Sequence, residues 1–154
     1  MARIIQGQQK SNGKRYGIVV SKFNDFITRR LLEGCLKELH RLGVRDSEIT
    51  VVYVPGSFEI PVAALKLAKK KTVHAVICLG AVIRGETLHF DLVAQGAAKG
   101  IGEVALLTGK PVIFGVLATD TVVQAEKRST LKGDNKGLEA ARSAVEMANL
   151  LGLV

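Results

Sequence analysis

The stretch VHAVICLG (73–80) decides the fold class, because its apolar residues follow one another without the alternation of a half-exposed strand. Three more short runs have the same character: YGIVVS (16–21), ITVVYV (49–54) and PVIFGVLA (111–118). Strands that are apolar on both faces are typical of a parallel sheet covered by helices on both sides. The sequence therefore predicts a four-stranded parallel sheet in an α/β protein.

Helical patterns separate these runs. From Thr28, six apolar side chains recur at intervals of three and four as far as Leu42, and Gly43 follows as a stop signal. Further helices are expected at about 59–70, 91–107, 121–130 and 137–151. Right-handed crossovers then give a flavodoxin-like three-layer sandwich. No linker or repeat divides the chain, so residues 1–154 are expected to form one domain.

The composition disfavours several classes of protein. Hydrophobic residues make up 47% of the 154 residues, which is enough for a core without disulfides. Residues 1–15 lack the apolar run of a signal peptide, and no stretch approaches the ~18 apolar residues of a membrane span, so a cytoplasmic location is expected. Cys35 and Cys78 fall in apolar segments, and no Cys/His cluster has ligand spacing, so no metal is expected.

The net charge of +8, from 22 basic against 14 acidic residues, is compatible with a nucleic-acid partner. The densest basic run, Lys66 and Lys69–Lys71, closes an expected helix, where cations interact favourably with the helix dipole. Aromatic residues are only 5% of the chain and do not alternate with basic ones. A soluble basic surface that attracts anionic substrates is favoured over a nucleic-acid interface.

The helix expected at 91–107 contains Gly96, Gly100 and Gly102, each of which costs roughly 1 kcal/mol relative to alanine. Together with neighbouring alanines, these glycines leave one face of the helix nearly bare. Close packing against another helix, in this chain or in another subunit, is the favoured interpretation. Local fraying of the helix is the alternative.

Polar residues follow each of the four strands. They are Ser21, Lys22, Phe23 and Asn24; Gly56, Ser57, Phe58 and Glu59; Arg84, Gly85, Glu86, Thr87 and His89; and Thr119, Asp120 and Thr121. Ligands of parallel α/β sheets bind outside the carboxyl ends of the strands, which share one edge. We therefore expect an enzyme whose active site lies at this edge.

His89 is the best acid/base candidate, because an imidazole titrates near neutral pH and His89 follows the third strand. His40 and His74 are expected on the surface. The turn Gly85–Thr87 precedes a helix, so its N–H groups could hold a phosphate, although an ordinary capping turn is the alternative. The motifs GxxxxGK[ST], GxGxxG and GxSxG are absent, which disfavours P-loop, dinucleotide and nucleophile-elbow chemistry.

Five segments together resemble the lumazine synthase family over essentially the whole chain. They are SKFN (21–24), VPGSFEIP (54–61), GAVIRGETLHFD (80–91), PVIFGVL (111–117) and NKGLEAARSAVEMANL (135–150). The combination of GAVIRGETLHF with PGSFEIP about two dozen residues upstream is highly specific to that family.

The resemblance implies a transferase that acts in the penultimate step of riboflavin biosynthesis. It would condense 5-amino-6-(D-ribitylamino)uracil with 3,4-dihydroxy-2-butanone 4-phosphate, without metal or organic cofactor. The products would be 6,7-dimethyl-8-ribityllumazine, phosphate and water. His89 matches the histidine that moves protons in the family.

The resemblance also implies roles for further residues. Phe23 matches the phenylalanine that stacks on the pyrimidine. The pyrimidine and ribityl site would comprise Phe23, Ser57, Phe58, Glu59, Ala81, Val82, Ile83, Phe114, Lys136 and Glu139. The phosphate site would comprise Gly85, Glu86, Thr87 and Arg128. Of these, Phe114, Arg128, Lys136 and Glu139 match residues that a neighbouring subunit donates.

The family forms homopentamers, in which the glycine-rich helix packs around the fivefold axis and an arm equivalent to residues 1–15 joins a neighbour's sheet. Some pentamers assemble into icosahedral capsids of sixty subunits, and association with riboflavin synthase is a further possible partnership. Residues Ser129–Leu131 and Asp134 depart from the usual pattern of capsid formers. The resemblance therefore leaves pentamer or capsid open.

Three rival functions stay open at this point. Archaeal-type riboflavin synthases look similar but dismutate two lumazines, and the intact GETLHF and PGSFE segments favour lumazine synthase over them. A flavin- or nucleotide-binding module without catalysis would tolerate His89→Ala. A nucleic-acid-binding protein would show strongly salt-dependent retention of DNA or RNA, and only the net charge supports it.

Overall fold

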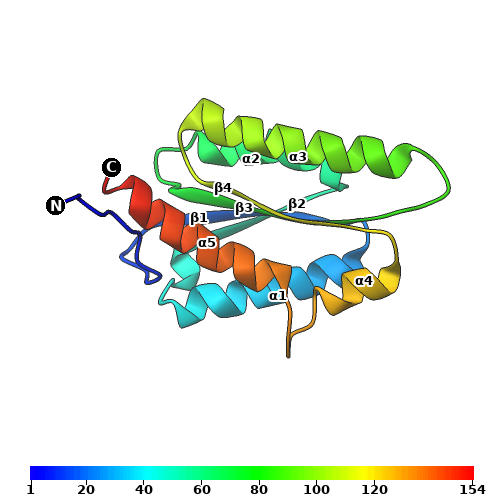
Figure 1. Cartoon of the computed structure of the whole chain (residues 1–154), viewed down its shortest axis with the longest axis horizontal. Coiled ribbons are helices and arrows are strands. Elements are labelled where there is room, and N and C mark those ends of the chain that lie inside the picture. Colours follow the sequence, from blue (N-terminus) through cyan, green and yellow to red (C-terminus); the bar gives the residue numbers. More distant parts are fainter.

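Four parallel strands form the middle layer of the molecule, in the order β2-β1-β3-β4 (Figure 1). The computed structural model describes all residues, 1–154. The strands are β1 (Tyr16–Ser21), β2 (Ile49–Val54), β3 (Ala75–Ile83) and β4 (Val112–Thr119). The helices are α1 (Asp25–Arg41), α2 (Ile60–Ala68), α3 (His89–Thr108), α4 (Val122–Lys127) and α5 (Lys136–Leu151), with short 3₁₀ turns η1 (Asp46–Glu48) and η2 (Ser57–Glu59).

Helices cover both faces of this sheet: α2 and α3 lie on one face, and α1 and α5 on the other (Figure 1). The core accordingly has two parts, and successive residues of β1 alternate between them. Ile18 and Val20 face α1 and α5, whereas Val19 faces α2 and α3. The continuous apolar runs of the sequence reflect this burial on both faces. The predicted flavodoxin-like three-layer fold is confirmed.

The strand order creates a switch point between β1 and β3, because the chain leaves β1 toward β2 on one side and returns to β3 on the other. All neighbouring strands are parallel, so their carboxyl ends lie at one edge of the sheet. Open α/β sheets bind ligands at such a point. The loops after β3 and β4 lie together at one end of the molecule, and both termini lie at the other (Figure 1).

A buried carboxylate links α1 to α5. Glu38 is only 2% exposed, and its Oε2 atom accepts a hydrogen bond of 2.9 Å from Arg142 Nε across the helix pair. Arg41, one turn along α1, donates to the same carboxylate. Hydrogen bonds from Arg41 and then Arg142 outweigh burial and lower the pKa of Glu38. The charge therefore stays in place at neutral pH and joins the two helices.

Two helices begin earlier than the sequence pattern predicts. Helix α1 starts at Asp25 rather than Thr28, because Asn24 adopts a left-handed conformation (φ 59°) and turns the chain directly from β1 into the helix. The Asn24 side chain donates to the Ala81 carbonyl oxygen at 2.9 Å, which fixes this turn. Helix α3 starts at His89 rather than about Asp91. Periodicity of apolar residues does not report such local turns.

The glycine-rich helix α3 is continuous, so local fraying is the wrong interpretation. A Cβ on Gly96 would come within 2.6 Å of the Phe58 ring, and one on Gly100 equally close to Pro61. These two glycines therefore let α3 pack closely on η2 and α2 of the same chain. A Cβ on Gly102 would meet open space, so packing against another subunit stays a prediction there.

The N-terminal arm, residues 1–15, contains no helix or strand and is held at its second half by α5. Asn149 Nδ2 donates to the carbonyl oxygens of Gln8 (2.7 Å) and Lys10 (2.9 Å). A Cβ on Gly7 would lie 2.1 Å from the Glu146 carbonyl oxygen, so the arm can approach α5 only with glycine there. Pairing of the preceding residues with a neighbour's sheet stays a prediction.

Several sequence-based expectations concern groups away from the sheet edge. Cys35 and Cys78 are both free and fully buried, as predicted, and burial raises the pKa of both thiols. No three His, Cys, Asp or Glu side chains gather as a metal-binding cluster would require. No helix is both long and apolar enough to cross a membrane. The cytoplasmic location stays a prediction.

Candidate active site

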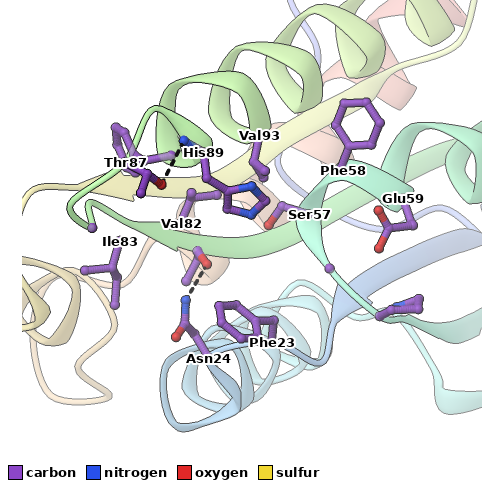
Figure 2. A pocket seen from close by; sticks show the side chains of 15 residues that line it. Phe23, Asn24, Ser57, Phe58, Glu59, Val82, Ile83, Thr87, His89 and Val93 are labelled. Atoms are coloured by element: carbon purple, nitrogen blue, oxygen red, sulfur yellow. Dashed lines mark hydrogen bonds between the residues drawn. The ribbon is translucent and has the colours of Figure 1, made fainter.

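A cavity of about 490 Å³ opens at the carboxyl ends of β1, β2 and β3 (Figure 2). Most of the residues predicted for the pyrimidine, ribityl and phosphate sites line it together with His89. They are Phe23, Ser57, Phe58, Glu59, Ala81, Val82, Ile83, Gly85, Thr87 and His89. The sheet edge thus brings together side chains from three loops that are far apart in the sequence.

Two exposed aromatic rings flank this cavity. Phe23 is 72% exposed and Phe58 is 59% exposed, whereas phenylalanine is usually buried in a folded protein. Phe23 lies on the α1 side and Phe58 on the η2 side in Figure 2. An exposed ring beside a cavity offers a flat apolar face to a planar ligand.

Backbone hydrogen bonds fix the main chain of Phe23 beside the cavity. The ladder between β1 and β2 continues past the strands, since Lys22 N–H donates to the Val54 carbonyl (2.8 Å) and Phe23 N–H to the Pro55 carbonyl (3.0 Å). The left-handed turn at Asn24 follows at once. Phe23 therefore occupies a fixed position between an extended ladder and a helix start.

Ser57 lies at the back of the cavity and is only 5% exposed. A Cβ on Gly80 would lie 2.5 Å from the Ser57 hydroxyl oxygen, so glycine at this point of β3 lets the η2 turn approach the sheet. The Ser21 hydroxyl, 3.1 Å from the same point, is buried and has no hydrogen-bond partner. The Ser57 hydroxyl and the Glu59 carboxylate come from the same turn and both line the cavity (Figure 2).

His89 is the first residue of α3, and its ring points into the cavity toward Ser57 and Val82 (Figure 2). Its backbone N–H donates to the Thr87 hydroxyl at 3.3 Å. A neutral imidazole has one donor and one acceptor nitrogen, so His89 can both give and take a proton at this position. The acid/base role of His89 stays a prediction.

The loop before α3 carries a run of free donors. The backbone N–H groups of Gly85, Glu86, Thr87 and Leu88 donate no hydrogen bond within the chain. They precede the positive end of a 20-residue helix, which is a favourable place for an anion. The N-cap residue Leu88 makes no side-chain cap, and the Thr87 hydroxyl accepts only the His89 N–H, so the four donors of residues 85–88 stay unused.

A second cavity, of about 430 Å³, lies beside β4 and the start of α5. Phe114, Arg128, Lys136 and Glu139 line it, and these are the four residues predicted to come from a neighbouring subunit. Arg128 donates to the Gln124 carbonyl at 3.1 Å and has no carboxylate within ion-pair distance. The predicted site residues thus divide between two cavities of one chain.

The comparison with known families agrees with these motifs. A family model described as 6,7-dimethyl-8-ribityllumazine synthase matches residues 13–152. The chain belongs to this lumazine synthase family. A protein of that name from Desulfotalea psychrophila is 52% identical over 151 residues, which are 98% of this chain and 97% of that protein. One from Desulfatibacillum aliphaticivorans is 53% identical over 150 residues, or 97% of each chain.

In this member of the lumazine synthase family, one predicted residue lines neither cavity. Glu86 is exposed in the loop before α3, so only its backbone N–H joins the run of free donors. The predicted contribution of Glu86 to a phosphate site can therefore come from the main chain. Its carboxylate would repel the same anion.

The other two histidines lie on the surface, as predicted. His40 accompanies Asp46, with 2.6 Å between Nε2 and Oδ1. His74 Nδ1 accepts the Arg15 N–H at 3.0 Å, and burial followed by the charge of Lys14 lowers the pKa of His74. Neither ring lines either cavity, so His89 is the imidazole available to the site.

Seven residues that line the two cavities were not predicted from the sequence as site residues: Pro55, Phe90, Val93, Val116, Leu117, Ala118 and Asp134. Phe90 and Val93 line the first cavity, and Val93 lies one helical turn after His89. The i, i+4 spacing from His89 was a signal that could have found Val93. Asp134 lines the second cavity, where its position beside Asn135 gave no comparable signal.

Proposed function

We propose that this chain condenses 5-amino-6-(D-ribitylamino)uracil with 3,4-dihydroxy-2-butanone 4-phosphate. The products are 6,7-dimethyl-8-ribityllumazine, one phosphate and two waters, and the enzyme is a transferase of riboflavin biosynthesis. One observation carries the proposal: His89 shares a cavity with the exposed Phe23 ring and with a loop of four free N–H groups. Membership in the lumazine synthase family supports it.

The pyrimidine binds against the Phe23 ring in this proposal. A flat heteroaromatic ring gains from an aromatic face, and 72% of Phe23 is available to it. The ribityl chain extends toward Ser57 and Glu59, where a hydroxyl and a carboxylate can hydrogen-bond to its hydroxyl groups. The backbone of Ala81–Ile83 forms the floor beneath the ring.

The phosphate of the second substrate binds at the loop before α3. The free N–H groups of Gly85–Leu88 can donate to its oxygens, and the helix dipole favours its negative charge. Arg128 adds a guanidinium that can bind two phosphate oxygens at once. Since Arg128 lines the second cavity, it reaches this phosphate from a neighbouring copy of the chain.

His89 transfers protons in each stage of the reaction. The 5-amino group attacks the ketone, and loss of water gives an imine. Removal of the proton from the adjacent carbon lets the C–O bond to phosphate break, and the phosphate leaves with the electron pair. The enol left by this elimination tautomerises to a ketone, which is the second carbonyl. The ribitylamino nitrogen then attacks that carbonyl, and loss of another water closes the ring. General acid/base catalysis of this kind contributes ~10²–10⁴-fold, and holding two reactants together contributes further.

The active enzyme is an oligomer in this proposal, with the pentamer of the family as the expected form. Its site forms where the first cavity of one copy meets the second cavity of its neighbour. The division of the predicted residues between two cavities supports this arrangement. So does the outer face of α3, where Leu92 and Leu106 are exposed. Capsid assembly and association with riboflavin synthase stay predictions.

The decisive assay follows lumazine formation from the two substrates optically against the spontaneous background. We expect a large excess with the wild type, a loss of about 100-fold with His89→Ala, and little change with His40→Ala. Wild-type protein that merely tracks the background contradicts the proposal. Riboflavin formation from the lumazine alone would then favour the dismutating relatives, and salt-dependent retention of RNA the nucleic-acid interpretation.

A further inference from the structure

We propose that Arg84 is the positioning residue that holds the loop before α3, and with it the phosphate donors and His89, against the loop after β4. The inference rests on the proposed function, because it concerns the same site. Arg84 lines neither cavity and therefore acts through other groups rather than on substrate.

Arg84 makes four contacts that join the two loops. Its backbone N–H donates to the Thr119 carbonyl at 2.8 Å, which ends the ladder between β3 and β4. Its Nε donates to Asp120 Oδ1 at 2.7 Å, and its Nη1 lies 3.7 Å from Asp91 Oδ2. Its guanidinium lies over the Phe90 ring, 4.5 Å from the centroid. Asp91 and Phe90 belong to the first turn of α3, so one side chain contacts both helix and loop.

The partner loop is far better fixed than the loop that Arg84 begins. Asp120 N–H donates to Gln124 Oε1 at 2.8 Å, and the Gln124 N–H donates to Thr121 Oγ1 at 3.1 Å. In contrast, the backbone N–H groups of residues 85–88 have no partner in the chain. Arg84 thus anchors an unconstrained segment to a constrained one, at the residue where that segment begins.

These contacts are partly exposed, with side-chain exposures of 48% for Arg84 and 64% for Asp120. Exposed ion pairs contribute little to the free energy of unfolding. A displacement of donors by about 1 Å, by comparison, can change a rate by about 100-fold. Loss of the Arg84 contacts should therefore appear in substrate kinetics and only weakly in stability.

The test compares Arg84→Gln, Arg84→Lys, Asp120→Asn and the double variant Arg84→Gln/Asp120→Asn in the intact enzyme. We expect Arg84→Gln to raise KM for the phosphorylated ketone roughly tenfold, with KM for the pyrimidine and the thermal midpoint nearly unchanged. Arg84→Lys keeps the charge but loses the planar fork, so an intermediate KM is expected. The double variant should be no worse than the more severe single one, because the two residues act as a pair.

Arg29→Gln serves as the matched control, since Arg29 forms an exposed ion pair with Asp25 (3.0 Å) within α1. Its kinetics should equal the wild type's. Unchanged KM values in Arg84→Gln would overturn the proposal. So would a parallel change in both KM values and the thermal midpoint, which indicates a merely structural role.

Hydrogen exchange of the amides in residues 89–96 separates this proposal from the proposed function. The first turn of α3 should exchange faster in Arg84→Gln than in wild type, and no substrate is needed for that measurement. A wild-type protein that forms no lumazine would refute the proposed function. The exchange result would still test whether Arg84 positions the loop. Equal exchange in the two proteins overturns it.

Discussion

The starts of α3 and α4 follow neighbouring parallel strands, yet their hydrogen bonding is opposite. At α4 the side chains of Thr121 and Gln124 form a reciprocal capping box that satisfies each other's backbone N–H groups. In the loop just before α3 the four N–H groups of residues 85–88 are free, although that helix is more than three times as long. The chain therefore satisfies the N–H groups of the loop before α4 and leaves free those of the loop before α3, which faces the cavity.

Arg128→Ala tests whether the open donors of α3 suffice for the phosphate. We expect KM for the phosphorylated ketone to rise tenfold or more, about 1.4 kcal/mol or above, because a charge-assisted pair is lost. Binding of the pyrimidine should persist, since Arg128 lines only the second cavity. Steady-state kinetics with each substrate varied in turn measures both effects. Unchanged KM for the ketone would mean that the open loop alone binds the phosphate.

Thr121→Ala disrupts the satisfied helix start. Loss of an N-cap side chain usually costs about 1 kcal/mol, so the free energy of unfolding should fall by roughly that amount. Turnover should stay near the wild-type value at temperatures where the variant is folded. Chemical denaturation followed by circular dichroism gives the first quantity, and the lumazine assay gives the second.

Thr87→Ala is the matched control at the open helix start, where the Thr87 hydroxyl accepts the His89 N–H. That bond is long, at 3.3 Å, and exposed, so we expect a smaller stability loss than for Thr121→Ala. Instead, His89 should be less precisely positioned in the variant, and turnover should fall severalfold. Equal stability losses and equal turnovers in the two variants would remove the contrast between the two helix starts.

The pH dependence of stability extends the comparison to Glu38, a charge that serves only the fold. Its pKa is lower in the folded chain than in the unfolded one, because Arg41 and Arg142 donate to it. The contribution of Glu38 to stability is therefore complete at pH values above its pKa in the unfolded chain, about 4.3. It is lost as the pH falls through its lower pKa in the folded chain. The difference in unfolding free energy between wild type and Glu38→Gln should be constant near pH 7 and shrink below pH ~4.

Glu33→Gln, an exposed change on the same helix, supplies the control for that experiment. Its unfolding free energy should follow the wild type's across the acid range. A Glu38→Gln difference that stays constant down to strong acid would contradict the assigned role of Glu38.

The strands were predictable because burial on both faces leaves a continuous apolar run in the sequence. Starts of helices were less predictable, as α1 and α3 show. Each depends on one local arrangement, the left-handed Asn24 or the Thr87 hydroxyl, that apolar periodicity does not encode. The TVVQ capping box (121–124), by comparison, is a pattern that a sequence does carry.

The parts of the site that follow from the order of the strands were predictable. The contacts between individual side chains were not. Polar residues after parallel strands must lie at one edge, and this rule alone brings His89, Phe23 and Ser57 into one cavity. The contact between Arg84 and Asp120 joins residues 36 positions apart and exists because β3 neighbours β4. No periodicity in the sequence indicates that pair.

The most direct test of a site divided between copies is complementation. His89→Ala and Arg128→Ala subunits are unfolded, mixed in equal amounts and refolded together, with each variant refolded alone as the control. If the first cavity of each copy meets the second cavity of its neighbour, roughly a quarter of all interfaces in the refolded mixture combine an intact His89 with an intact Arg128. We predict that the mixture forms lumazine at low ketone phosphate well above the mean of the two controls. A mixture that equals this mean would contradict the divided site.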